Sequence, residues 1–157
     1  MFTDNQISDI IDLLIQYPDS KVYIGSDSVR FLKGNMMYAR YAVILVIHKN
    51  GNKGCRIFSY TTDDKDYDLK ENKPVLRMMK ETQLACELYV ELAPILDGFD
   101  VEIHLDIATD PAQGSYCAMR QATGYVLGMT GIEPKLKPES FVASFGADAV
   151  AHGRSLH

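Results

Sequence analysis

Four acidic residues occupy apolar or small-residue surroundings, where an isolated charge is costly. Asp27 lies in IGSDS, Glu81 in RMMKETQLA, Asp106 in IHLDIA and Asp148 in SFGADAVAH. If the fold gathers these carboxylates, they repel and raise one another's pKa, and a divalent cation relieves the repulsion. Their hard oxygen donors suit Mg²⁺ or Mn²⁺. Two such ions roughly 4 Å apart can activate a water and stabilise the leaving oxygen of a phosphodiester.

Each of these acids also has an ordinary structural role open to it. An Asp at a strand end, such as Asp27 or Asp106, often forms a turn or caps a helix, and Asp148 is placed to cap the last helix. A Glu on a helix is usually solvated, and Glu87 competes with Glu81 as the inward-facing acid. Whether the acids form a site therefore depends on whether the fold brings them together.

Histidines and serines accompany the acids. His104 precedes Asp106 by two residues, so the two side chains share a strand face. It could orient a metal ligand or contact a phosphate, or it could be a core histidine bonded to backbone. His152 follows Asp148 by four residues and could shuttle a proton, or it could simply face the helix dipole. The hydroxyls of Ser26 and Ser28 are expected to bond to local backbone.

The bulk composition is that of one soluble globular domain of 157 residues, and 46% of them are hydrophobic. No apolar run is long enough to cross a bilayer, and the N-terminal 20 residues have no basic leader. Three widely spaced cysteines predict neither a disulfide framework nor a zinc ribbon, so we expect a cytoplasmic protein. The net charge of -5 argues against strong nonspecific nucleic-acid binding, although a bound metal would supply positive charge locally.

Patterns along the chain predict a mixed α/β fold. Residues 1–19 should form an N-terminal helix, and 20–155 the core of a single domain. Strands are expected at 21–28, 36–49 and 55–62, with a hairpin signal at 50–54. An acidic segment, 62–73, is expected to be a solvated loop. Helix 73–99, strand 100–110, helix 114–131, a short fifth strand at 132–138 and a closing helix should follow.

This order suggests an antiparallel meander followed by strand–helix alternation, which fits a mixed sheet covered by helices. Right-handed crossovers would make the later strands parallel to the first. Sites in such sheets form at the carboxyl ends of adjacent parallel strands. Asp27 ends the first expected strand and Asp106 ends the fourth. If those two strands are neighbours, their carboxylates meet.

Four segments resemble one known family when taken in order. They are VYIGSDS, RMMKETQLACEL, VEIHLDI and LKPESFVASFGADAVAHG. They resemble the YkuK-like proteins, a branch of the ribonuclease-H-like superfamily, and the likeness covers roughly residues 20 to 155. The resemblance implies a five-stranded mixed sheet of order 3-2-1-4-5, with strand 2 antiparallel, and two-metal phosphodiester hydrolysis. By the same resemblance Asp27, Glu81, Asp106 and Asp148 are the metal ligands.

Three functional hypotheses follow. The first is a nuclease using two Mg²⁺ or Mn²⁺ ions on RNA, an RNA–DNA hybrid or structured DNA, with Asp27, Glu81, Asp106, Asp148 and His152 as its catalytic residues. The second is a non-catalytic ribonuclease-H-like binding module, which the negative charge and sparse basic residues favour. The third is a small-phosphoester hydrolase using the same ions. Lysines near 49–56 and 135–137 could contact phosphates, but solvation explains them as well.

Overall fold

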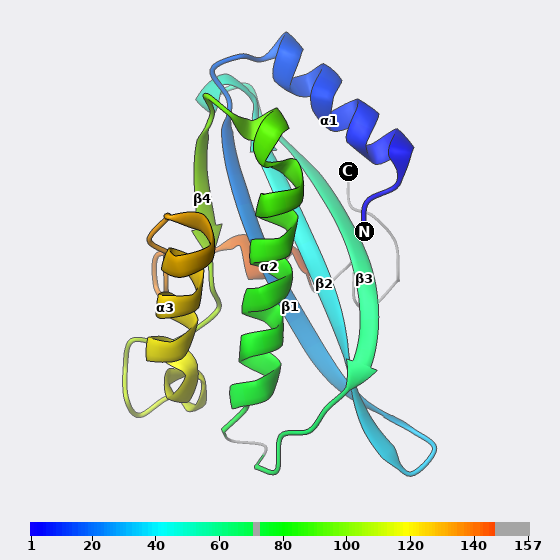
Figure 1. Cartoon of the computed structure of the whole chain (residues 1–157), viewed down its shortest axis with the longest axis vertical. Helices are drawn as coiled ribbons and strands as arrows, with labels where there is room; N and C mark the ends of the chain where they lie inside the picture. The colour runs from blue at the N-terminus through cyan, green and yellow to red at the C-terminus, as the bar shows by residue number, and fades with distance from the viewer. Residues whose placement is uncertain (71–72, 147–157) are drawn as a thin grey trace.

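The computed structural model describes residues 1–70 and 73–146. Within them, four strands and three α-helices are joined by short connections and three 3₁₀ turns (Figure 1). The elements in chain order are α1 (Asp4–Gln16), β1 (Lys21–Lys33), β2 (Met36–His48), η1 (Lys49–Gly51), β3 (Cys55–Lys65), α2 (Val75–Leu96), β4 (Asp100–His104), η2 (Gly114–Ala118), α3 (Met119–Thr130) and η3 (Val142–Phe145).

The strands form a mixed sheet in the order β3-β2-β1-β4. β2 is antiparallel to both β1 and β3, whereas β4 is parallel to β1. The predicted fifth strand is not confirmed, because its segment makes only one isolated parallel bridge, between His104 and Lys135. Two backbone hydrogen bonds, Lys135 N–H to Ile103 O (2.8 Å) and Leu105 N–H to Lys135 O (2.9 Å), still align this segment with β4. Prolines at 134 and 138 lack N–H donors, which limits how far a ladder can extend.

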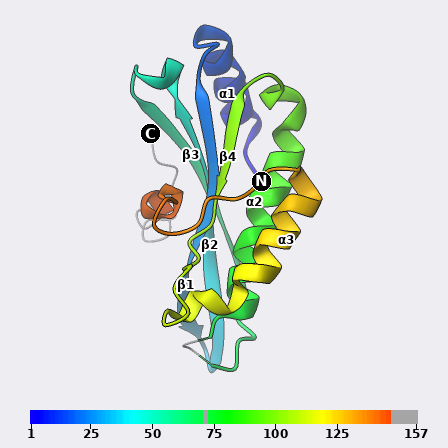
Figure 2. The same ribbon diagram turned by 90° about the vertical axis from the view of Figure 1, so that its left-hand side faces the viewer.

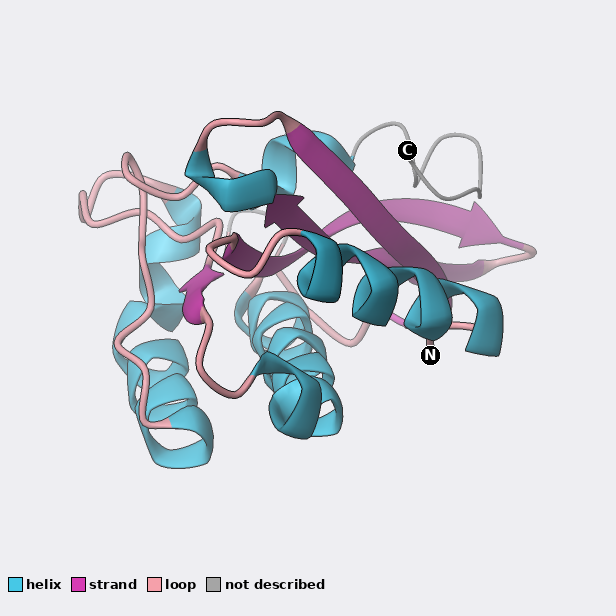
Figure 3. Cartoon of the chain, turned by 90° about the horizontal axis from the view of Figure 1, so that it is seen from above, coloured by secondary structure: helices cyan, strands magenta, loops and turns pink. Residues whose placement is uncertain are grey.

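The two faces of the sheet are covered unequally. α2 and α3 lie side by side on one face, and η3 lies on the other (Figures 2 and 3). The main core fills the α2 face, and it includes Val22, Ile24, Leu88 and Ile103. A smaller cluster of Ala42, Ile44, Val46 and Val142 fills the η3 face. Odd-numbered β1 residues point toward η3 and even-numbered ones toward α2, as strand alternation requires.

β1 and β2 form a hairpin that is longer than predicted. β1 continues five residues past 28 and stays paired with β2 as far as Lys33 and Met36. β4 pairs with β1 only up to Gly25, and β3 pairs with β2 only as far as Tyr38. The hairpin therefore reaches beyond both neighbouring strands (Figure 1).

The acidic segment 62–73 is not simply the solvated loop that its composition predicts. β3 runs to Lys65. The Asp66 side chain is 1% exposed and pairs with Arg30 through the Arg30 Nε atom at 2.5 Å. The Asp68 carboxylate accepts hydrogen bonds from the backbone N–H groups of Leu76 (2.8 Å) and Arg77 (2.9 Å), at the start of α2. Asp68 is bound there because a helix N-terminus offers unpaired N–H donors, whereas the partner of Asp66 is the Arg30 side chain.

The predicted helices are found with altered ends. Thr3 and Gln6 form a capping box that begins α1. The segment 114–131 divides into η2 and α3, and Gly131 ends α3 with a left-handed φ of 72°. Within the described residues, the closing segment shows only the short turn η3.

Candidate active site

Asp27 and Asp106 lie at the place where the two parallel strands separate. The last residues paired between β1 and β4 are Gly25 and His104. Each aspartate follows its paired residue by two positions, so both carboxylates continue the same register. Alternation along β1 places Asp27 on the η3 face, and Asp106 lies two residues past the end of β4. The predicted meeting of the two acids therefore agrees with the strand order and register.

The environment of Asp27 makes its charge costly. The pKa of Asp27 is raised to about 6, chiefly by burial and to a smaller extent by the nearby Asp106 charge, against the opposing effect of the Ser28 backbone hydrogen bond. Gly146 packs directly on this side chain. A Cβ atom at position 146 would lie 2.8 Å from Asp27 Cβ and 3.1 Å from Ile44 Cδ1, so the close approach requires glycine.

Glu81 approaches from the α2 side of the sheet. It is 4% exposed and accepts a hydrogen bond from the Ser28 hydroxyl. Burial raises the pKa of Glu81 well above its usual value, and the charges of Asp27 and Asp106 raise it further. A small cavity is lined by Glu81 and Asp106 together with Ser26, Thr82, Leu105 and Ile107. Glu81 therefore belongs to the same electrostatic cluster as the two aspartates, although it comes from the opposite face.

The alternative helix acid occupies a different environment. Glu87 is exposed and accepts a hydrogen bond from the side chain of Gln83 at 2.8 Å. Glu87 is therefore a surface residue, whereas Glu81 is buried against β1. The predicted choice of Glu81 over Glu87 agrees with this placement.

Two cations complete the cluster, and sequence reasoning did not assign either to it. The Arg77 Nη1 atom donates to Ser28 Oγ at 3.3 Å, so Ser28 lies between Arg77 and Glu81. The Lys137 Nζ atom lies 3.1 Å from Asp106 Oδ1. Arg77 precedes Glu81 by four residues, which places both on one side of the helix and could have indicated the pairing. The predicted local backbone role of Ser28 is wrong, because its hydroxyl bonds to a side chain.

His104 has the structural role that was one of its two predicted alternatives. It is 2% exposed, and its Nδ1 accepts the backbone N–H of Phe141 at 3.0 Å. Its Nε2 lies 2.9 Å from Glu102 Oε2, which makes Nε2 the protonated nitrogen. Burial lowers the pKa of His104, against the opposing effect of Glu102. The neutral ring thus anchors the segment that leads into η3.

Two predicted site residues, Asp148 and His152, lie outside the described residues. Within 1–70 and 73–146, no group of three His, Cys, Asp or Glu side chains is arranged to hold a metal ion. The donor chemistry of Asp27 and Asp106 nevertheless fits a hard divalent cation. Burial and the nearby Asp106 charge make the ionisation of Asp27 costly, and Lys137 is a cation already in contact with Asp106. These two residues and Glu81 stay the predicted ligands.

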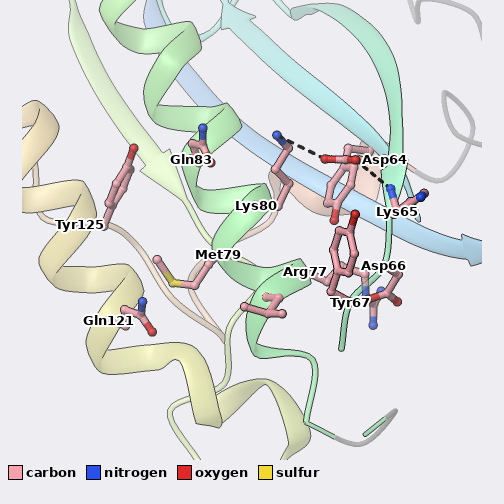
Figure 4. A pocket seen from close by; sticks show the side chains of 12 residues that line it. Asp64, Lys65, Asp66, Tyr67, Arg77, Met79, Lys80, Gln83, Gln121 and Tyr125 are labelled. Carbon is pink, nitrogen blue, oxygen red and sulfur yellow. Dashed lines mark hydrogen bonds and ion pairs between the residues drawn. The ribbon is translucent and has the colours of Figure 1, made fainter. Parts of the chain in front are cut away.

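A separate surface pocket of about 370 Å³ lies next to the cluster (Figure 4). Residues from the end of β3, α2 and α3 line it, including Asp64, Lys80 and Tyr125. Lys80 and Asp64 form an ion pair across it, with Nζ and Oδ2 3.7 Å apart. Arg77 lines this pocket as well as contacting Ser28, but Asp27, Glu81 and Asp106 do not line it. The pocket is therefore adjacent to the carboxylates rather than part of their site.

A mixed sheet with β2 antiparallel and β4 parallel to β1, and with two carboxylates just past the last β1–β4 pair, agrees with a ribonuclease-H-like arrangement. A Ribonuclease H-like family model matches residues 5–152, and the chain belongs to that family. The YkuK-like resemblance is thereby confirmed. No curated protein and no solved structure matches the chain significantly. No helix in the described part of the chain is long and apolar enough to cross a membrane.

Proposed function

We propose that this chain is a metal-dependent phosphodiester hydrolase that acts on nucleic acid. One observation carries the proposal: Asp27 and Asp106 lie just past the last β1–β4 pair and close enough for their charges to interact, in a chain of the ribonuclease-H-like family. Two Mg²⁺ or Mn²⁺ ions, when bound, would neutralise the carboxylates and activate a water for attack on phosphorus.

Each residue near such a site would have its own role. Asp27 and Asp106 would hold the ions from the sheet, and Glu81 from α2, with Asp148 as a fourth ligand. Ser28 orients the Glu81 carboxylate through its hydrogen bond, and Arg77 in turn donates to Ser28. Lys137 neutralises Asp106 when no ion is bound and would be free to contact a substrate phosphate after release. His152 would serve proton transfer near the leaving group.

A cleavage assay tests the proposal. Wild type, Asp27→Asn and Asp12→Asn are compared on RNA, RNA–DNA hybrid and branched DNA, with Mn²⁺ and with EDTA. Asp12 is an exposed residue of α1 and supplies the matched control. We expect Mn²⁺-dependent cleavage by wild type and Asp12→Asn, and a loss of at least about a hundredfold in Asp27→Asn. Equal rates in all three proteins would refute the assignment.

A non-catalytic binding module is the second candidate. The ion pair between Lys137 and Asp106 favours it, because an internal cation can stabilise a carboxylate that no longer holds metal. Calorimetry with Mn²⁺ separates the two functions. Binding that is lost in Asp106→Asn supports the hydrolase. A folded protein without metal affinity supports the module. Hydrolysis of model phosphomonoesters, without cleavage of polynucleotides, would instead indicate a small-phosphoester hydrolase.

A further inference from the structure

The projecting part of the β1–β2 hairpin carries an unusual surface on the same face as Asp27. Six side chains alternate onto this face and define what we call the ribbon face: Val29, Phe31, Lys33, Met36, Tyr38 and Arg40. Asp27 pairs with Ala42 immediately before them, so the ribbon face continues directly from the candidate active site. Neither β4 nor η3 extends along it (Figure 1).

Aromatic rings and cations alternate along the ribbon face. The Phe31 and Tyr38 rings stack across the hairpin, with centroids 5.9 Å apart and an interplanar angle of 29°. The Arg40 guanidinium lies 5.2 Å from the Phe31 centroid, and Lys33 Nζ lies 5.5 Å from that of Tyr38. Such stacked rings and cation–ring contacts stabilise an isolated hairpin. Hairpin stability alone is therefore the simplest explanation for their presence.

Exposure and charge indicate more than hairpin stability. Val29 is 42% exposed and Met36 48% exposed, at either end of the aromatic pair. The ribbon face itself carries two cations, Lys33 and Arg40, and no acid, in a chain whose net charge is -5. The third cation of this segment, Arg30, lies on the opposite face of β1 and pairs with Asp66. An apolar and aromatic strip flanked by cations, on a hairpin whose β1 side has no neighbouring strand past Gly25 in the described residues, is typical of a surface that binds a polyanion with flat bases.

We propose that an unpaired nucleic-acid strand lies along the ribbon face, with its bases against the aromatic and apolar side chains and its phosphates near Lys33 and Arg40. This inference rests on the proposed function, since it identifies how that site would hold its substrate. Six residues of strand separate Asp27 from Lys33, or about 20 Å at about 3.3 Å per residue. At about 3.4 Å per stacked nucleotide, the arm accommodates roughly six nucleotides beyond the bond to be cut.

Asp63 restrains one of the two cations. Its carboxylate accepts two hydrogen bonds from Arg40, from Nε at 2.7 Å and from Nη2 at 2.9 Å. Because Asp63 faces the same side of the sheet as Arg40, its charge would also repel a phosphate there. Removing that charge should therefore strengthen binding, whereas removing charge from Lys33 should weaken it. These opposite signs make the inference sharply testable.

Fluorescence anisotropy with labelled oligothymidylate and oligouridylate, in EDTA, measures binding without cleavage. We expect Lys33→Glu to weaken binding at least fivefold and to reduce the salt slope by about 1. Phe31→Ser should weaken it roughly 5- to 100-fold, and Asp63→Asn should tighten it. Arg120→Glu, at an exposed position of α3 on the opposite face of the sheet, is the matched control and should change nothing. Affinity should rise with the length of the oligonucleotide up to roughly six nucleotides and then level off.

Equal affinity of Lys33→Glu and Arg120→Glu would overturn the inference, as would weaker binding by Asp63→Asn. Preference for duplex over single strand in every protein would also overturn it. Failure of the proposed function looks different. If Lys33→Glu loses binding but neither wild type nor Lys33→Glu cleaves nucleic acid with Mn²⁺, the ribbon face is supported as a binding surface and the proposed hydrolysis is refuted. If wild type and Lys33→Glu cleave equally well and bind with equal affinity, the proposed hydrolysis is supported and the role of the ribbon face is refuted.

Discussion

Replacing Asp27 with asparagine should stabilise the metal-free protein at neutral pH. Burial and the Asp106 charge raise the pKa of Asp27 from 3.8 to about 6. Because this pKa is higher in the folded state, the stabilisation that the protonated carboxyl supplies is fully present below pH 3.8 and is lost as the pH rises through about 6. At about 1.4 kcal/mol per pKa unit, the ionised group costs about 3 kcal/mol near pH 7.5 and about 1 kcal/mol near pH 4.5.

Urea unfolding in EDTA at these two pH values measures the difference. Asp27→Asn should exceed wild type in unfolding free energy by up to about 3 kcal/mol near pH 7.5, and the gain should shrink by about 2 kcal/mol near pH 4.5. Loss of the Asp27 charge also removes repulsion at Glu81, which acts in the same direction. Asp12→Asn, on the surface of α1, is the control and should show no such pH dependence. A gain that is absent, or equal at both pH values, would refute the reasoning.

Two further predictions concern packing and hydrogen bonding around the site. A Cβ at Gly25 would lie 2.8 Å from Val142 Cγ1, so Gly25→Ala should lower the thermal midpoint by the equivalent of about 1–3 kcal/mol. Gly124→Ala, on a helix with open space around it, should raise stability by up to about 1 kcal/mol; equal effects of the two alanines would contradict the packing. Ser28→Ala should cost about 1–3 kcal/mol by leaving the Glu81 carboxyl without its donor. Ser26→Ala should cost little, because the Ser26 hydroxyl is buried without a hydrogen-bond partner, and chemical denaturation that ranks these two variants the other way round would disprove the assignment.

The order of elements and the place of the two aspartates could be predicted because local patterns are sufficient for them. The apolar residues 22–24 and the alternation of polar and apolar residues in 100–105 specify strands, and the helix between them allows a parallel return. Once β1 and β4 are parallel neighbours, Asp27 and Asp106 must come close. The family resemblance, supported by the match over residues 5–152, extended this prediction to Glu81.

The hairpin length and the acidic segment were not predictable in the same way. Residues 29–33 mix polar and apolar side chains in a pattern that indicates no buried face. Only their pairing with β2 makes them a strand. Asp66 and Asp68 have the composition of a solvated loop, yet Arg30 and the start of α2 supply their partners. Those partners are far away in sequence, so no local pattern contains them.

By itself, the sequence indicated four of the strands and the α-helices between them, placed Asp27 on the first strand and Asp106 next to the fourth, and identified the family to which the chain belongs. Only the tertiary structure decided that Glu81 rather than Glu87 faces those aspartates, that Ser28 bonds to Glu81, and that His104 anchors Phe141. The physical reason is that burial and hydrogen-bond partners are properties of contacts between distant segments. Periodicity indicates which way a side chain points along its own element, but not what it meets there.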